Sequence, residues 1–239
     1  MSAPLAERLR PKTIDDYIGQ EHLVGKNGVF RKFFETGNVP SFILWGPPGV
    51  GKTTLAKIVA TQLDRPFFTL SAVTSGVKEV REVIESARKQ RFFDQRPPFL
   101  FIDEIHRFNK SQQDSLLGAV EQGIVTLIGA TTENPSFEVI SPLLSRCQVY
   151  ILRPMEDKDL QTLLDRALTA DIELREREIE VQQTGALFRF AGGDARKLLN
   201  ILDIIVGATD GKVTITDQYV TDCLQQNIAL YDKNGEQHY

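Results

Sequence analysis

Short apolar runs alternate with amphipathic stretches over roughly the first two thirds of the chain. Most residues in these runs are β-branched, aromatic or leucine, which is typical of buried strands. The runs cover residues 42–45, 67–70, 99–102, 125–130 and 147–152, and apolar positions recur at helical spacing over residues 52–63, 77–91 and 111–121. Strands that alternate with helices predict an α/β fold, in which helices cover both faces of a five-stranded parallel sheet.

The alternation stops near Arg153 and Pro154, and a helical pattern replaces it. Helices are predicted over residues 156–170, 178–191, 194–207 and 216–226, with Asp194 as an N-cap. We therefore expect an α/β domain over residues 1–154, followed by a small all-helical lid domain over residues 155–228. Residues 229–239 begin a further segment and end abruptly, so we interpret the chain as a truncated form of a longer protein.

A glycine-rich loop lies between the first predicted strand and the helix that follows it. Its sequence, Gly-Pro-Pro-Gly-Val-Gly-Lys-Thr, matches the phosphate-loop pattern G-x-x-x-x-G-K-[ST]. Glycines let backbone N–H groups turn toward phosphate oxygens, Lys52 can reach the β- and γ-phosphates, and the Thr53 hydroxyl suits Mg²⁺. The residues expected to bind ATP here are Gly46, Pro47, Pro48, Gly49, Val50, Gly51, Lys52, Thr53 and Thr54.

Two acids follow the third predicted strand. Asp103 would hold magnesium through its water shell, and Glu104 would orient and deprotonate the attacking water. Two acids at the end of a strand can also be a helix cap and its first turn. A phosphate loop one strand, helix and strand earlier favours the catalytic interpretation. Together the two motifs predict an enzyme, a Mg²⁺-dependent ATPase that converts ATP and water to ADP and phosphate.

Composition says little about the function, but it limits the cellular compartment and the kind of DNA contact to be expected. No stretch approaches 18 consecutive apolar residues, so no membrane-spanning helix is expected. The N-terminus lacks the apolar core of a signal peptide, and the two cysteines, Cys147 and Cys223, show no pairing pattern. We expect a reduced, cytoplasmic protein. The net charge is −4, with 19 basic and 16 acidic residues in 1–154 but 9 and 16 in 155–239. Any contact with DNA should therefore come from a local patch on the first part.

Several further strings resemble those of AAA+ ATPases of the clamp-loader group. They are Asp-Glu-Ile-His-Arg-Phe at 103–108, Gly-Ala-Thr-Thr-Glu-Asn-Pro at 129–135, Ser-Arg-Cys at 145–147 and Gly-Asp-Ala-Arg at 193–196. The opening, with Leu-Arg-Pro-Lys at 9–12 and Tyr-Ile-Gly-Gln-Glu-His-Leu at 17–23, resembles the replication-associated recombination protein A family more narrowly. The resemblance covers nearly the whole chain.

This resemblance implies roles for residues at matching positions. Arg10, Pro11, Tyr17 and Ile18 would cradle adenine, although packing of this segment on the sheet would explain the same residues. Thr132 would be the first sensor of the γ-phosphate, Arg196 the second sensor on the lid, and Arg146 an arginine finger for the neighbouring subunit's ATP. The family also implies a tetramer built by a C-terminal oligomerisation domain, and a bacterial, nucleoid-associated location.

The implied biological role is DNA-dependent ATP hydrolysis in replication-fork maintenance and recombination-linked repair, with remodelling of DNA junctions or ends. The alternative is a nucleotide-gated, DNA-binding recruiter of partners such as single-strand-binding protein, in which hydrolysis only resets the switch. Lys78 and Arg81, three residues apart on one predicted helix, could hold a DNA backbone near that helix's N-terminus, although a solvated helix with ion pairs is an equal alternative. The three histidines, His22, His106 and His238, lack the spacing of metal ligands.

Overall fold

The computed structural model describes residues 3–91 and 96–225, which fall into two compact units. The sheet unit comprises Pro11–Arg153, and the helical unit comprises Met1–Arg10 together with Pro154–Tyr239. The chain therefore passes between the units twice, at Arg10–Pro11 and at Arg153–Pro154. The second crossing lies next to the domain boundary expected from the sequence. The first corrects that expectation, because residues 1–10 belong with the helical unit and not with the ATPase domain.

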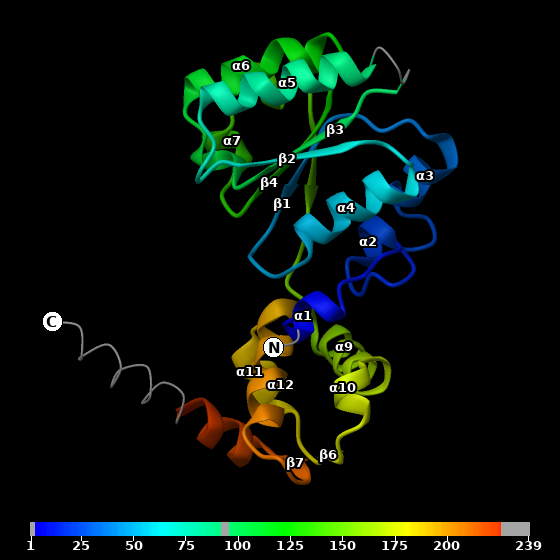
Figure 1. Ribbon diagram of the computed structural model, residues 1–239, viewed down its shortest axis with the longest axis vertical. Helices are drawn as coiled ribbons and strands as arrows, with labels where there is room; N and C mark the ends of the chain where they lie inside the picture. Colours follow the sequence, from blue (N-terminus) through cyan, green and yellow to red (C-terminus); the bar gives the residue numbers. More distant parts are fainter. Residues whose placement is uncertain (1–2, 92–95, 226–239) are drawn as a thin grey trace, which may run out of the picture. The chain divides into compact units, whose positions relative to one another are not determined.

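The sheet unit contains the five-stranded parallel sheet that the sequence predicts (Figure 1). Its strands are β1 (Phe42–Trp45), β2 (Phe67–Ser71), β3 (Phe99–Asp103), β4 (Thr126–Thr131) and β5 (Gln148–Ile151). They are hydrogen-bonded in the order β2-β3-β4-β1-β5, and every pair is parallel. Side chains of β3 and β4 are buried along both faces, as expected for central strands with helices on either side.

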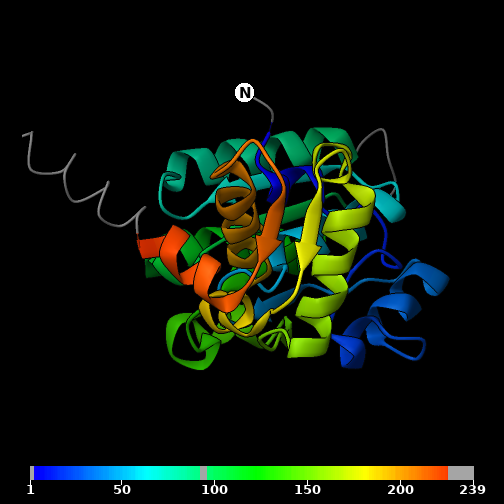
Figure 2. The ribbon, with the colours of Figure 1, turned by 90° about the horizontal axis from the view of Figure 1, so that it is seen from below.

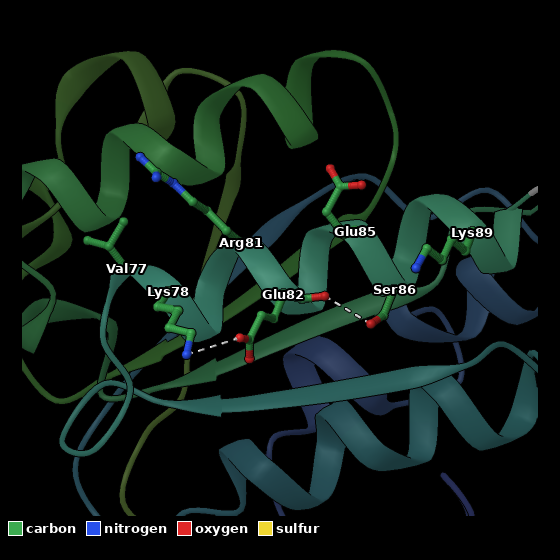
Figure 3. A pocket seen from close by; sticks show the side chains of 7 residues that line it. All are labelled: Val77, Lys78, Arg81, Glu82, Glu85, Ser86 and Lys89. Carbon is green, nitrogen blue, oxygen red and sulfur yellow. Dashed lines mark hydrogen bonds and ion pairs between the residues drawn. The ribbon is translucent and has the colours of Figure 1, made fainter.

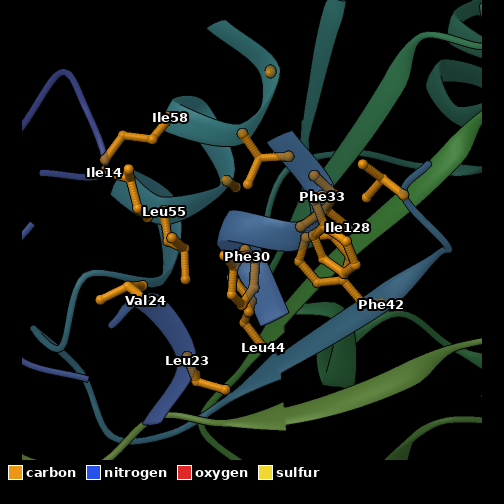
Figure 4. Close-up of a cluster of buried hydrophobic side chains, with 14 of the residues drawn as sticks. Ile14, Leu23, Val24, Phe30, Phe33, Phe42, Leu44, Leu55, Ile58 and Ile128 are labelled. Atoms are coloured by element: carbon orange, nitrogen blue, oxygen red, sulfur yellow. The ribbon is translucent and has the colours of Figure 1, made fainter. Parts of the chain in front are cut away.

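Helices cover both faces of this sheet and divide its core into two layers. On one face lie α3 (Val29–Thr36) and α4 (Lys52–Gln62), and on the other α5 (Val77–Arg91) and α6 (Lys110–Glu121) (Figure 1). The first layer contains the aromatic rings of Phe30, Phe33 and Phe42, which contact one another (Figure 4). The second layer packs α5 and α6 against side chains of β3 such as Leu100 and Ile102. Four short elements join these parts: α2 (Glu21–Val24), η1 (Ile105–Arg107), α7 (Pro135–Glu138) and α8 (Ser141–Leu144).

The helical unit is mainly α-helical, as expected, but it also contains a two-stranded parallel sheet. Its helices are α1 (Leu5–Arg8), α9 (Asp157–Ala170), α10 (Ile172–Arg175), α11 (Gly185–Ala191) and α12 (Ala195–Gly207), and residues 217–225 are also helical. Strands β6 (Ile179–Val181) and β7 (Val213–Ile215) pair in parallel, side by side in Figure 2. The prediction of one helix over 178–191 was therefore wrong for its first part. Residues 226–239, including the predicted start of a further domain, lie outside the described residues.

Helix α1 is anchored in the helical unit by charge as well as by burial. Leu5 is fully buried, and its N–H donates to Asp203 Oδ2 over 2.9 Å. The Arg8 guanidinium donates to both carboxylate oxygens of Asp171, with Nε to Oδ2 at 2.8 Å and Nη2 to Oδ1 at 3.0 Å. Asp171 is 5% exposed and also caps α10 by accepting from the Leu174 N–H. The hydrogen bond from Arg8 lowers the pKa of this carboxyl, which keeps it charged in the folded protein.

Among the described residues, no helix is long and apolar enough to cross a membrane.

The Arg8–Asp171 pair predicts a pH-dependent contribution to stability. Because the folded-state pKa of Asp171 is depressed, the pair stabilises the fold above the unfolded-state pKa of about 4, and the contribution is lost as the pH falls through the folded-state value. Asp171→Asn, which can still cap α10, should lower the free energy of unfolding in urea by about 2 kcal/mol at neutral pH. The difference from wild type should shrink below about pH 4. Glu173→Gln, which removes a half-exposed partner of Arg8, should change the free energy by less than about 1 kcal/mol at any pH. An equal loss in both variants would contradict this account.

Candidate nucleotide site

Three sequence motifs meet where β1, β3 and β4 end: the phosphate loop, the acids at 103 and 104, and the string at 129–135. We call this place the carboxyl edge of the sheet. The phosphate loop follows β1, Asp103 ends β3, and Thr131 ends β4. Trp45 is opposite Thr131 in the register, and the Gly46 N–H donates to the Thr131 carbonyl over 3.1 Å. Since ligands of open parallel α/β sheets bind outside the carboxyl ends of the strands, the topology places all three motifs at one ligand site.

The phosphate loop has a conformation that only a glycine-rich segment adopts readily. Gly49 and Gly51 have φ of 71° and 93°, in the left-handed region, and Gly51 is the N-cap of α4. The Lys52 side chain folds back over the loop, where its ammonium donates to the carbonyls of Gly46 at 2.7 Å and Pro47 at 2.8 Å. Thr53 and Thr54 follow in the first turn of α4 and are partly exposed. The loop thus holds a positive charge beside the N-terminus of an 11-residue helix, an arrangement that favours anions.

The Tyr17 side chain forms a hydrogen bond with this loop. It is buried, and its hydroxyl donates to the Val50 carbonyl over 2.9 Å. Burial raises the pKa of Tyr17, so the hydroxyl stays protonated and remains a donor. A Cβ at Gly51 would collide with this hydroxyl, so the position of the Tyr17 side chain requires glycine at position 51. Tyr17 was predicted to cradle adenine. The hydrogen bond that its hydroxyl makes in the structure is with the phosphate loop. Pro11 and Ile18 are partly exposed nearby in sequence, and Arg10 belongs to the helical unit.

The two acids after β3 differ in their backbone conformation. Asp103 continues the strand, and its carbonyl accepts from the Ala72 N–H over 3.1 Å. Glu104 has φ of 55° and ψ of 45°, a left-handed conformation that is uncommon outside glycine and concentrated at functional sites. It turns the chain directly from β3 into η1. Both side chains are partly exposed, so a ligand could reach either carboxylate.

The end of β4 places two threonines in different settings. Thr131 is fully buried, and its hydroxyl accepts from the Glu133 N–H over 3.0 Å. Thr132, the predicted first sensor, is partly exposed one residue further along. Successive residues of an extended chain point in opposite directions, so only one of the two can face the sheet interior. Thr132 therefore remains available for a ligand, and Thr131 is part of the framework.

One residue that the sequence reasoning set aside stands between these motifs. His106 Nδ1 lies 2.9 Å from Thr131 Oγ1, and its Nε2 lies 3.3 Å from Glu104 Oε2. It lacks metal-ligand spacing, and we discounted it for that reason. The signal that could have identified it is the string Asp-Glu-x-His itself, since the two residues after Glu104 form a tight turn that brings position 106 back to position 104.

The two arginines with expected roles lie on other elements of the chain. Arg146 is exposed just before β5, forms an ion pair with Glu121 at the end of α6, and donates to the Pro142 carbonyl over 2.6 Å. Arg196 is exposed in the first turn of α12, in the helical unit. Arg146 thus presents a guanidinium on the surface of the sheet unit, where a second chain could meet it.

The predicted DNA contacts lie on an exposed face of α5 (Figure 3). Lys78 Nζ lies 3.8 Å from Glu82 Oε1, and Arg81 is exposed on the same helix. The helix N-terminus, expected to help hold a phosphate, carries an acid instead: Glu79 accepts from the Gly76 N–H over 2.8 Å. Hydrogen bonds from its own and the Gly76 backbone N–H lower the pKa of Glu79, so this position is negatively charged. Lys78 and Arg81 themselves remain as the predicted support for DNA contact at this end of the helix.

The donor groups at the carboxyl edge fit Mg²⁺ bound together with a nucleotide. In the part of the chain that the structure describes, no three histidine, cysteine or acidic side chains gather into a metal site. One hydroxyl, that of Thr53, and one carboxylate, that of Asp103, are oxygen ligands of the kind that Mg²⁺ uses when phosphates and water complete its shell. The site therefore suits a metal that arrives with ATP better than a resident metal.

The contact between Tyr17 and the phosphate loop gives a direct test of this geometry. Tyr17→Phe leaves the Val50 carbonyl without its buried donor, which should lower the free energy of unfolding by about 1–2 kcal/mol. Loss of this support should also weaken binding of a fluorescent ATP analogue, measured by anisotropy. Tyr150→Phe is the control, because that ring packs in the same core and only loses a hydroxyl. If both variants bind nucleotide as wild type does, Tyr17 does not hold the loop in shape.

Comparisons with known proteins match both parts of the chain to AAA proteins. Residues 42–155 match the family model described as "ATPase family associated with various cellular activities (AAA)", and residues 173–239 match "AAA C-terminal domain". The first match covers the sheet from β1 to its last strand, with both motifs. A solved structure described as "Thermotoga maritima RuvB Holliday junction branch migration motor" superposes with a TM-score of 0.71 at 29% identity, over 91% of this chain and 72% of that one.

The sequence is also similar to full-length proteins. Replication-associated recombination protein A of Escherichia coli (strain K12) is 42% identical over 99% of this chain and 54% of its own length. The protein of that name from Bacillus subtilis (strain 168) is 35% identical over 99% of this chain and 56% of its own. ATPase WRNIP1 of Dictyostelium discoideum is 43% identical over 99% of this chain but 29% of its own length. The chain thus spans about half the length of its bacterial relatives. It belongs to the AAA family of ATPases, in the group of replication-associated recombination protein A.

Proposed function

We propose that this chain binds ATP with Mg²⁺ at the carboxyl edge of the sheet and hydrolyses it. The observation that carries the proposal is the series of contacts from the phosphate loop through Thr131 and His106 to Glu104, one of the acids after β3. Gly46 to Thr54 would surround the phosphates, and phosphate oxygens would take over the Lys52 ammonium from the loop carbonyls. Thr53 and Asp103 would hold Mg²⁺, which supplies charge neutralisation between the β- and γ-phosphates.

Glu104 would act as the general base of the reaction. It accepts a proton from a water molecule whose oxygen bonds to the γ-phosphorus. The bond between that phosphorus and the β–γ bridging oxygen breaks, and ADP leaves with the electron pair. Thr132 would contact the γ-phosphate or the water through its hydroxyl. Arg196 would act as the second sensor of the γ-phosphate, and Arg10, Pro11, Tyr17 and Ile18 would border the adenine. Burial of the charge-bearing groups by nucleotide strengthens each contact.

Arg146 would complete the site of a neighbouring chain. Support comes from its exposed position and from its ion pair with Glu121, which holds the guanidinium at the protein surface. Arginine fingers contribute about 10³–10⁵ in rate. The bacterial relatives are about twice as long as this chain. Self-association, as a tetramer in the whole protein, is part of this proposal. Turnover by this chain alone should then be slow and should rise with protein concentration.

In its wider role, the protein would couple ATP hydrolysis to DNA during replication-fork maintenance and recombination-linked repair. The names of its relatives and of the structural neighbour support this setting. DNA junctions or single-strand/double-strand ends are the substrates proposed for remodelling, in the bacterial cytoplasm at the nucleoid. A partner such as single-strand-binding protein would belong to the recruiting alternative, in which hydrolysis only resets the nucleotide state.

Glu104→Gln tests the hydrolytic assignment. The amide keeps the shape of the side chain but cannot accept the proton, so turnover in a phosphate-release assay should fall by roughly 10²–10⁴ while binding of the ATP analogue stays unchanged. Glu133→Gln is the matched control, since this exposed acid lies after β4 and engages Thr131 only through its backbone. Turnover that survives in Glu104→Gln, or that falls equally in both variants, would remove Glu104 from the mechanism.

The DNA contact is tested by the salt dependence of binding. Replacing Lys78 and Arg81 together by alanine should reduce the slope of log K against log salt by about 1.4–1.8, the value for two lost phosphate contacts. Lys57→Ala, which removes an exposed cation from α4 on the other face of the sheet, should leave the slope unchanged. An unchanged slope in the double variant would place the DNA elsewhere. DNA binding that depends on nucleotide without any stimulation of hydrolysis would favour the recruiting alternative.

A further inference from the structure

His106 is a polar side chain that the hydrolytic mechanism has not used. It lies on η1, immediately after the acids, with its ring between Glu104 and Thr131. The distances are 2.9 Å from Nδ1 to Thr131 Oγ1 and 3.3 Å from Nε2 to Glu104 Oε2. The His106 side chain is 12% exposed and that of Glu104 31%, so the ring is largely enclosed and the carboxylate reaches toward solvent.

The carboxylate of Glu104 indicates which ring nitrogen carries a proton. A neutral imidazole has one N–H and one acceptor nitrogen, and a carboxylate can only accept. Nε2 must therefore carry the proton if it faces Glu104, which leaves Nδ1 to accept from the Thr131 hydroxyl. That hydroxyl also accepts from the Glu133 N–H at 3.0 Å and lies 3.1 Å from the Glu133 carbonyl, a second acceptor for its single proton. The proton on Nε2 follows from the facing carboxylate, whichever of these two acceptors takes the Thr131 proton.

Thr131 is a rigid support for the ring. It is fully buried at the end of a central strand, and its carbonyl accepts from the Gly46 N–H at the start of the phosphate loop. Gly46 in turn accepts from the Lys52 ammonium. A continuous series of contacts therefore runs from the lysine of the phosphate loop, through Thr131 and His106, to Glu104. Outer residues of this kind fix the orientation of the groups that act on substrate.

We propose that His106, itself oriented by Thr131, is a positioning residue for Glu104. Nε2–H faces Oε2 of the carboxylate and limits its rotation, which leaves Oε1 free for the attacking water. The contact acts on the general base alone and does not touch ATP. This inference rests on the proposed function, because positioning matters only if Glu104 activates water.

Two substitutions of His106 separate its two contacts. Glutamine places an amide nitrogen near the position of Nε2, whereas asparagine reaches only to the position of Nδ1. His106→Gln should keep kcat within about threefold of wild type, and His106→Asn should lower kcat about 10- to 100-fold. KM for ATP and affinity for the ATP analogue should be unchanged in both. In the Glu104→Gln background, His106→Asn should have no further effect on the residual rate. Full kcat in His106→Asn, or an equal loss in both variants, would overturn the proposal.

Thr131→Val and Thr131→Ser provide the same comparison one step further away. Valine matches the shape of threonine but has no hydroxyl, so it should lower kcat with KM unchanged, and serine should restore it. Serine and valine variants of equal activity would show that Thr131 acts only through packing, and would overturn its place in the proposal. Thermal unfolding of each variant shows whether the fold is retained.

A measurement without turnover tests the contacts themselves. Nitrogen-15 NMR of the imidazole rings distinguishes the two neutral tautomers, and the His106 signals are those lost in His106→Gln. The Nε2–H tautomer should predominate, Glu104→Gln should shift the Nε2 signal, and Thr131→Val should increase the population protonated on Nδ1. Signals that ignore both substitutions would overturn the inference even if the chain hydrolyses ATP. Conversely, shifted signals in a chain without ATPase activity would contradict the proposed function and leave the contacts established.

Discussion

The candidate site depends on the position of a single buried residue, Thr131. Its carbonyl accepts from the first residue of the phosphate loop, and its hydroxyl contacts His106, which faces Glu104. Thr131 ends a central strand and is paired there with Trp45 of β1, so its position is tied to the start of the phosphate loop. The phosphate loop and Glu104, the proposed general base, are therefore fixed relative to each other by the sheet. Such pre-organisation is the main way in which a protein stabilises developing charge in phosphoryl transfer.

A second constraint comes from the N-terminal segment, which is divided between the two units. Residues from Pro11 onward belong to the sheet unit, where Tyr17 supports the phosphate loop and the Gln20 amide pairs with the backbone of Arg153 over 2.6 and 2.9 Å. Leu5 and Arg8 are buried in or paired with the helical unit. Arg153 is the last residue before the chain leaves the sheet unit. Residues near both chain crossings are thus held within their own units by these contacts.

Much of the sheet unit could be predicted from the sequence because its signals are local. Five strands appeared as short apolar runs, and α5 was predicted over the residues it occupies. The order β2-β3-β4-β1-β5 is set by tertiary pairing and has no local signal. The misassigned strand β6 has a physical explanation: Ile179 and Val181 alternate with acids at strand spacing, but the segment is too short to outweigh the helical pattern around it. Residues 1–10 were assigned to the ATPase domain because their contact with the helical unit has no local signal. Arg8 pairs with Asp171, which lies 163 residues further along the chain.

The candidate site shows the same division. The phosphate loop and the paired acids were visible because their chemistry is contained in contiguous residues. His106 and Thr131 were missed because their importance lies in a contact across 25 residues. Glu79, which occupies the N-terminus of α5, shows the reverse case, in which a local capping contact reduces a predicted ligand site to two exposed cations.

The central claim is that the carboxyl edge of the sheet is a ready-formed site for ATP hydrolysis, with Glu104 as its base. A crystal structure of the chain with Mg²⁺ and a non-hydrolysable ATP analogue tests this claim most directly. We predict the γ-phosphate at Lys52, Mg²⁺ at Thr53 and near Asp103, and a water molecule between Glu104 and the γ-phosphorus, with both contacts of Thr131 retained. Nucleotide bound away from this edge, or a water molecule held by another carboxylate with Glu104 turned away, would contradict it.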